Sequence, residues 1–133
     1  MSLAGLSHVA VRCRDLDASA RFYAEVLGLR VGPRPPFGFP GRWLYGEAGA
    51  AIVHLLDADD AAARRYTGAA ASVGAGAVDH IAFAATDWPA MRARLDGLGV
   101  PFQTRQAPDT GAAQVFLRDP DGVTIELNFQ DPL

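Results

Sequence analysis

Cysteine is almost absent from this chain of 133 residues, in which Cys13 is the single example. One cysteine cannot form a disulfide within the chain, and its rarity is typical of proteins from reducing compartments. The first residues lack the basic region and cleavage site of a secretory leader. No apolar run approaches the roughly 20 residues that a membrane-spanning helix needs. We therefore expect a cytoplasmic protein.

Clusters of basic residues are also missing. The chain has 12 Lys and Arg against 15 Asp and Glu, a formal net charge of −3. Binding to nucleic acid depends on a basic patch, so we expect neither nucleic acid nor a membrane as a partner, but a small molecule. Half of the residues are hydrophobic and 20% are charged, which is typical of a folded globular domain.

The chain contains an internal repeat with a spacing of 72 residues. Three pairs have this spacing: His8 with His80, Asp15 with Asp87, and His54 with Glu126. The segments 43–56 and 115–128 also align at this spacing without a gap. We predict one domain over residues 1–133, made of two modules at about 4–57 and 78–131 with a linker at 58–77.

Each module is predicted to run strand, helix and then three strands, a βαβββ order in an α+β fold. The first module has strands at 6–13, near 29–34, at 42–47 and at 51–56, with a helix from Leu16 to Leu27 that ends at Gly28. The second has strands at 78–85, 101–105, 113–118 and 123–129, with a helix at 88–98. A short helix and an Ala/Gly-rich segment are expected in the linker.

All three histidines fall on one face of the predicted strands. Large apolar residues alternate with them and suit the face that packs under the helices. The face with the histidines otherwise carries small or polar side chains, and we interpret it as the wall of a cavity. Four of its positions are equivalent in the repeat: His8, His54, His80 and Glu126.

Three imidazoles and one carboxylate are suitable ligands for a divalent Fe, Ni, Zn, Mn or Co ion. Taken singly, a strand histidine is most often a hydrogen-bonded structural group or a surface residue, and a glutamate such as Glu126 is most often an exposed strand residue. Their joint position on one face favours a metal site.

The motifs around these residues are LSHVAV at 6–11, RFYAEVLGL at 21–29, VDHIAF at 78–83 and FLRDPDGVTIEL at 116–127. With them the sequence resembles the vicinal oxygen chelate superfamily, which includes glyoxalase I, extradiol ring-cleaving dioxygenases, fosfomycin-modifying enzymes and bleomycin-binding proteins. The resemblance implies tandem βαβββ modules that form curved mixed sheets around a metal site. It also implies a homodimer, with His8, His80 and Glu126 as metal ligands.

His54 occupies the fourth ligand position, where glyoxalase I usually has a glutamate. It is either a fourth ligand or an acid or base close to the metal, so His54 and Glu126 are the candidate catalytic residues. The resemblance implies a metal-dependent, glyoxalase-like lyase or isomerase whose substrate is chelated through two adjacent oxygens. One alternative is an Fe(II) extradiol-type dioxygenase, and another is a bleomycin- or fosfomycin-resistance-type binding or modifying protein.

A loop rich in Pro and Gly, residues 32–42, could cover the pocket. The candidate substrate-binding residues are Arg12, Phe37, Phe39, Trp43 and Asn128. The alternative is that the loop aromatics only pack the loop down and that Arg12 is a solvated charge at the end of a strand.

Overall fold

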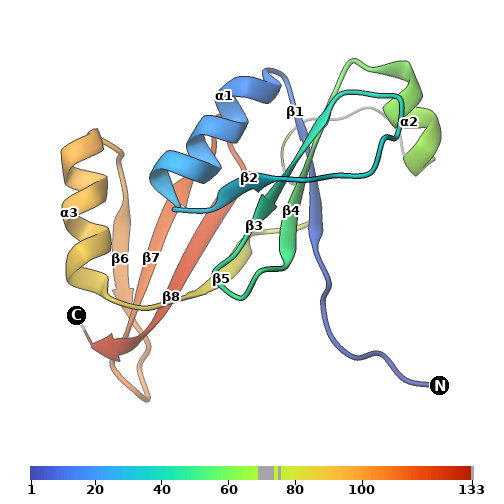
Figure 1. The fold of residues 1–133 in the computed structure, drawn as a ribbon. Coiled ribbons are helices and arrows are strands. Elements are labelled where there is room, and N and C mark those ends of the chain that lie inside the picture. Colours follow the sequence, from blue (N-terminus) through green and yellow to red (C-terminus); the bar gives the residue numbers. More distant parts are fainter. Residues whose placement is uncertain (69–73, 75, 133) are drawn as a thin grey trace. The chain divides into compact units, whose positions relative to one another are not determined.

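The computed structural model describes residues 1–68, 74 and 76–132, which form two compact units, Met1–Gly74 and Ala75–Leu133. Each unit contains a four-stranded mixed sheet with helices, so the predicted α+β fold with the βαβββ order is confirmed (Figure 1). Most of the Ala/Gly-rich part of the predicted linker lies outside the described residues. In the described part of the chain, no helix is both long and apolar enough to cross a membrane.

The first unit has a sheet in the order β1-β4-β3-β2, in which β1 is parallel to β4 and the other neighbours are antiparallel. Its elements are β1 (Val9–Cys13), α1 (Leu16–Arg21), the π-helical turn η1 (Phe22–Val26), β2 (Arg30–Gly32), β3 (Gly41–Tyr45), β4 (Ala51–Asp57) and α2 (Ala61–Thr67). The helix predicted from Leu16 to Leu27 is thus α-helical only to Arg21, and the widened turn that follows places Tyr23 and Val26 in the core.

The second unit repeats this arrangement with the order β5-β8-β7-β6. Its elements are β5 (Ile81–Ala85), α3 (Trp88–Leu98), β6 (Gln103–Gln106), β7 (Ala112–Arg118) and β8 (Thr124–Pro132). The helix α3 has the bounds predicted from the sequence. It packs on the sheet through Trp88, whose ring centroid lies 5.5 Å from that of Phe129.

The two faces of the strands differ as predicted. In β4, Val53 and Leu55 are fully buried on the core side, while His54 between them faces the other way. In β8, Ile125 and Leu127 are buried in the core on either side of Glu126. The apolar face of each sheet therefore packs in the core, and the opposite face presents His54 or Glu126 as a candidate functional side chain.

The pairing of the strands in the two hairpins, β3–β4 and β7–β8, differs by one residue from the ungapped alignment of the repeat. Trp43 lies directly opposite His54, and the residue opposite Glu126 is Phe116. The ungapped alignment instead equates Trp43 with Val115. An irregularity in the pairing between Leu44 and Tyr45 accounts for the difference of one residue. Phe116 is therefore the structural counterpart of Trp43.

Candidate functional site

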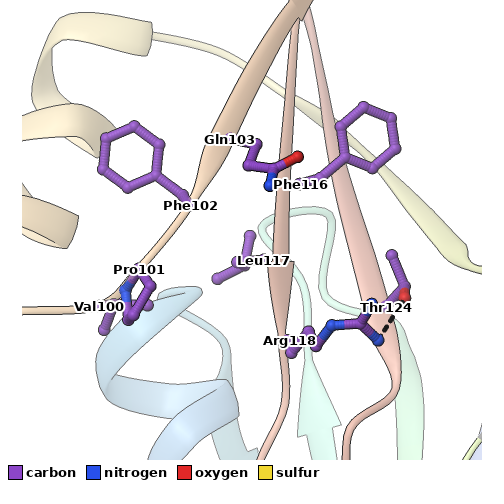
Figure 2. Close-up of a pocket in the computed structure, with 8 residues that line it drawn as sticks. All are labelled: Val100, Pro101, Phe102, Gln103, Phe116, Leu117, Arg118 and Thr124. Carbon is purple, nitrogen blue, oxygen red and sulfur yellow. Dashed lines mark hydrogen bonds between the residues drawn. The ribbon is translucent and has the colours of Figure 1, made fainter.

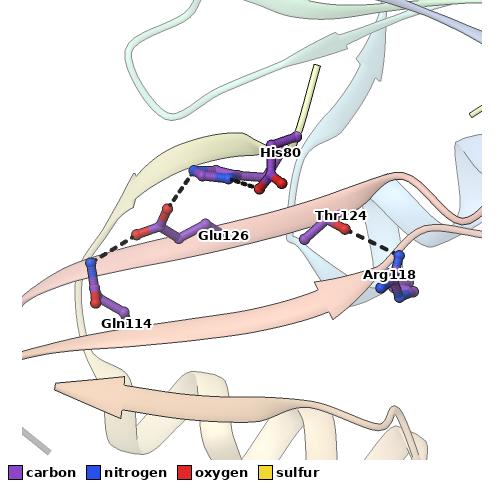
Figure 3. A network of polar contacts seen from close by, with 6 residues as sticks. His80, Gln114, Arg118, Thr124 and Glu126 are labelled. Carbon is purple, nitrogen blue, oxygen red and sulfur yellow. Dashed lines mark hydrogen bonds and ion pairs between the residues drawn. The ribbon is translucent and has the colours of Figure 1, made fainter. Parts of the chain in front are cut away.

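Glu126 is the buried acid of the second unit, with only 6% of its surface exposed. It lies in β8 between Ala82 of β5 and Phe116 of β7. Its Oε2 atom lies 2.9 Å from Nε2 of His80, and its Oε1 atom accepts a hydrogen bond of 3.2 Å from the side-chain amide of Gln114 (Figure 3). Both carboxylate oxygens are therefore engaged, one by a neutral donor and one by an imidazole.

His80 has a carboxylate next to each of its ring nitrogens. Oδ1 of Asp79 lies 2.7 Å from Nδ1, opposite to the contact that Nε2 makes with Glu126. The hydrogen bond that His80 donates to Asp79 raises the pKa of His80 above its ordinary value, and the negative charge of Glu126 adds to this against the opposing effect of burial. A carboxylate at the second nitrogen is also what orients metal-binding imidazoles in proteins.

His54 of the first unit is held between two other rings. Its ring centroid lies 3.8 Å from that of His8 on one side and 4.0 Å from that of Trp43 on the other, and both pairs are stacked. The Nε2 atom lies 3.1 Å from the carbonyl oxygen of Ala51. Since a carbonyl only accepts, this contact requires a proton on Nε2 and leaves the lone pair of a neutral ring on Nδ1.

The surroundings of His54 favour its neutral form. Burial lowers the pKa of His54, and the charges of His8 and Arg34 lower it further, while the hydrogen bond to Ala51 acts in the opposite direction. His54 and His80 are therefore shifted in opposite directions from the same ordinary value. This suits a neutral, proton-accepting His54 and a His80 that interacts with carboxylates.

The predicted substrate-binding aromatics form a cluster around Phe37. The ring centroid of Phe37 lies 5.4 Å from Phe39, 6.2 Å from Trp43 and 5.2 Å from Tyr66 of α2. Arg34 lies over the ring of Phe37, with its Cζ atom 5.0 Å from the centroid. Because Trp43 also stacks on His54, the cluster is continuous with the His8–His54 pair.

The other two predicted substrate residues make different contacts. Arg12 of β1 donates a hydrogen bond of 2.9 Å to the hydroxyl of Thr67 at the end of α2. Asn128 is partly buried in β8 of the second unit, two residues beyond Glu126, opposite Ala84 and Gln114. It therefore shares the face of the sheet that carries Glu126.

The four predicted metal ligands are brought together in pairs, His8 with His54 and His80 with Glu126. Among the described residues, no group of three or more His, Cys, Asp or Glu side chains is close enough to hold a metal ion. The chemistry of the second pair fits a divalent ion. An imidazole nitrogen and a buried carboxylate oxygen face each other there, and each has its other polar atom held by a neighbour.

Several residues of these clusters were not predicted as site residues. Gln114 depends on the exact register of β7 against β8, which the sequence pattern does not define. Tyr66 belongs to the short helix of the predicted linker, and Arg34 to the Pro- and Gly-rich loop in which only the aromatics were singled out. Asp79 was visible as the carboxylate directly before a candidate ligand.

A cavity of about 440 Å³ lies in the second unit (Figure 2). Its walls are residues 100–103 and 116–118 together with Thr124. Phe116, which lines the cavity, is the residue opposite Glu126 in the β7–β8 pairing, but no predicted metal ligand lines the cavity. Within the second unit, the cavity is therefore distinct from the His80–Glu126 pair.

Comparison with known proteins identifies one family. The profile of the Glyoxalase/Bleomycin resistance protein/Dioxygenase superfamily matches residues 5–127. A protein of Arabidopsis thaliana named "Glyoxylase I 4" is 32% identical over 131 residues, which are 96% of this chain and 71% of that protein.

Two solved structures share the fold. A lactoylglutathione lyase from Agrobacterium tumefaciens is 23% identical with a TM-score of 0.71, and the match covers 96% of this chain and 95% of that one. The fosfomycin resistance protein FosX from Listeria monocytogenes is 18% identical with a TM-score of 0.69, over 96% and 94% of the two chains.

Proposed function

The chain belongs to the Glyoxalase/Bleomycin resistance protein/Dioxygenase superfamily, and we propose that it is a divalent-metal-dependent, glyoxalase-like lyase or isomerase. Its substrate is a small molecule that binds the metal through two adjacent oxygens. The observation that carries the proposal is the contact of 2.9 Å between Nε2 of His80 and Oε2 of the buried Glu126. The name of the Arabidopsis relative supports the glyoxalase type of reaction.

In this proposal His8, His80 and Glu126 bind the metal, and His54 is a fourth ligand or an acid or base beside it. When bound, the ion acts as a Lewis acid for the negative charge that develops on a chelated oxygen. Gln114 holds Oε1 of Glu126, so Oε2, which now faces Nε2 of His80, would be the oxygen that binds the metal in place of that contact. Asp79 holds the second nitrogen of His80 in the same way.

In this proposal, His54 or Glu126 transfers the proton in the reaction. His54 is suited to accept a proton through Nδ1, because its lowered pKa keeps the ring neutral and its Nε2 faces a carbonyl oxygen. Glu126 is the second candidate for this role, since it is the carboxylate of the proposed ligand set. The part of the substrate that does not bind the metal would then lie along the aromatic cluster, with Arg12 and Asn128 as further contacts.

Replacing Glu126 with Gln is the decisive experiment. The E126Q variant should keep its fold, because Ile125 and Leu127 do the packing in β8, but it should lose affinity for Ni, Zn and Fe(II). Metal stoichiometry after reconstitution and circular dichroism are the measurements. The matched control is E25Q, since Glu25 is exposed in η1. Full metal occupancy and turnover in E126Q would contradict the ligand assignment.

An Fe(II) extradiol-type dioxygenase is the second candidate, because two histidines and one glutamate are the ligands of such enzymes. The two reactions differ in their need for oxygen. Oxygen uptake with Fe(II) and catechols would favour the dioxygenase, and turnover of an aldehyde with a thiol under argon would favour the lyase or isomerase. A wild-type protein that takes up no metal would contradict both and favour a resistance-type binding protein.

A homodimer in the cytoplasm completes the proposal. The buried position of Cys13, the only cysteine of the chain, agrees with a reducing compartment. Light scattering during size-exclusion chromatography should give twice the chain mass of 14.1 kDa. A mass equal to that of one chain would contradict the dimer.

A further inference from the structure

Arg34 is held in the loop between β2 and β3 by three contacts. Its Cζ atom lies 5.0 Å from the ring centroid of Phe37 and 5.4 Å from that of Phe39. Its Nη1 atom donates a hydrogen bond of 3.0 Å to the carbonyl oxygen of Phe39. The guanidinium is thus fixed in place by aromatic faces and a backbone oxygen, none of which carries a formal charge.

The positive charge of Arg34 has no counterpart in the described part of the chain. The ion pairs found there join other residues, and Nε of Arg34 is buried without a hydrogen-bond acceptor. A buried donor without an acceptor is unfavourable in a folded protein. The Arg34 side chain as a whole is only partly buried, so part of it is open to solvent. A negatively charged ligand that contacts the exposed part of the guanidinium would supply the counter-charge.

The guanidinium lies over the same face of the sheet as His54. Gly41 of β3 shares that face with Trp43, and a Cβ atom at position 41 would come within 2.8 Å of Nη2 of Arg34. The glycine therefore makes room for the guanidinium. In agreement, the charge of Arg34 is one of the effects that lower the pKa of His54.

Aromatic rings that are open to solvent lie next to this cation. Phe39 is buried and serves to anchor the loop. Phe37 is only partly buried, and Tyr66, whose ring centroid lies 5.2 Å from that of Phe37, is 65% exposed. Exposed rings beside a cation are suited to contact an apolar part of a ligand that carries a negative charge.

We propose that Arg34 binds an anionic group of the substrate, a carboxylate or a phosphonate, while Phe37 and Tyr66 contact a planar apolar part of the same molecule. The substrate class is then a small aromatic or unsaturated anion whose charged group is separate from its two adjacent oxygens. The assignment of this ligand as the substrate rests on the proposed function. The binding of the anion by Arg34 does not.

Metal-free protein tests the anion site by itself. Benzoate, phenylphosphonate and benzamide are titrated separately, and binding is followed by the amide signals of residues 33–42 in ¹⁵N–¹H spectra. The R34M variant should weaken binding of the preferred anion by about tenfold or more, the effect of one charge-assisted hydrogen bond, and leave benzamide unchanged. The relative affinities of benzoate and phenylphosphonate decide between the carboxylate and the phosphonate.

Two further variants make the result specific. R34K keeps the charge but loses the planar fork, so its affinity should lie between those of the wild type and R34M. R65M removes the same charge from an exposed position in α2 and should bind as the wild type does. Equal anion affinity in the wild type and R34M, or an equal loss in R65M, would overturn the proposal. Failure of the wild type to bind metal would instead contradict the proposed function and leave this result unchanged.

Discussion

The imidazole of His54 and the indole of Trp43 lie face to face, with ring centroids 4.0 Å apart and planes 10° from parallel. The two residues are directly opposite in the β3–β4 hairpin, where side chains on one face are close neighbours. His8 covers the other side of the imidazole. The position of His54 is therefore set by strand register and stacking, before any ligand is bound.

The two shifted histidines are expected to titrate on opposite sides of 6.5, their ordinary pKa. In the metal-free protein the NMR signals of His54 should change below this pH, because burial and the charge of His8 disfavour its protonated form. The signals of His80 should change above it, because Asp79 and Glu126 favour the protonated form. The H54Q and H80Q variants assign the signals, and reversed midpoints would contradict the expectation.

The same shifts predict how stability depends on pH. His54 has a lowered pKa in the folded state, so the unfolded chain binds its proton more readily, and stability falls as the pH drops below 6.5. His80 has a raised pKa, so its contribution is present at acid pH and is lost as the pH rises through that pKa. Urea unfolding should show the first dependence weakened in H54Q and the second weakened in H80Q.

Much of the fold was predictable because its signals are local. The cap at Asp87 and the glycine after Leu98 define α3, and alternation places His54 and Glu126 on the face away from the core. The repeat adds a second, independent copy of each signal. Local patterns of this kind persist because packing and propensity act in the same direction.

The remaining features depend on contacts between strands and loops. The counterpart of Trp43 is Phe116 rather than Val115, because the pairing of β3 with β4 shifts between Leu44 and Tyr45. Neither the hydrogen bond from Gln114 nor the place of Arg34 over Gly41 has a signal along the sequence. Such contacts depend on how strands and loops pair with one another, and a register error of one residue would reverse the face.

Asp87 and Asp15 provide a matched pair of helix caps with different backbones. Both side chains accept a hydrogen bond from the amide three residues on, but Asp87 has a φ of 61° and Asp15 a φ of −126°. D15A should lose only the cap, about 1 kcal/mol. D87A should lose the cap and also place alanine in the left-handed region, about 2–3 kcal/mol together. D87N should cost little, because asparagine tolerates this region and can cap.

Urea unfolding of these three variants measures the differences. Equal losses in D15A and D87A would mean that the backbone at Asp87 relaxes at no cost. A D87N variant as unstable as D87A would mean that the negative charge of the cap, rather than its geometry, stabilises α3.

Two glycines are expected to respond to alanine in opposite ways. A Cβ atom at Gly41 would lie 2.9 Å from the carbonyl oxygen of Leu55 and 2.8 Å from Nη2 of Arg34, so G41A should destabilise the protein by about 1–3 kcal/mol. Gly97 lies in α3, and a Cβ there would meet nothing within 4 Å. G97A should therefore stabilise the protein by about 0.5–1 kcal/mol. Thermal unfolding distinguishes the two, and a stable G41A would show that both Arg34 and the backbone at Leu55 can move aside.

Gln114 is expected to act on the metal through Glu126. Its amide holds Oε1 of the carboxylate at 3.2 Å, so Q114A should free the carboxylate to rotate and lower metal affinity by about 10- to 100-fold. Q114E should lower it as well, because a second carboxylate would face Glu126 without a hydrogen bond. The control is Q130A, since Gln130 is exposed on the same strand as Glu126. Competition with a fluorescent chelator gives the affinities, and a Q114A variant that binds metal as tightly as Q130A would show that Glu126 needs no such support.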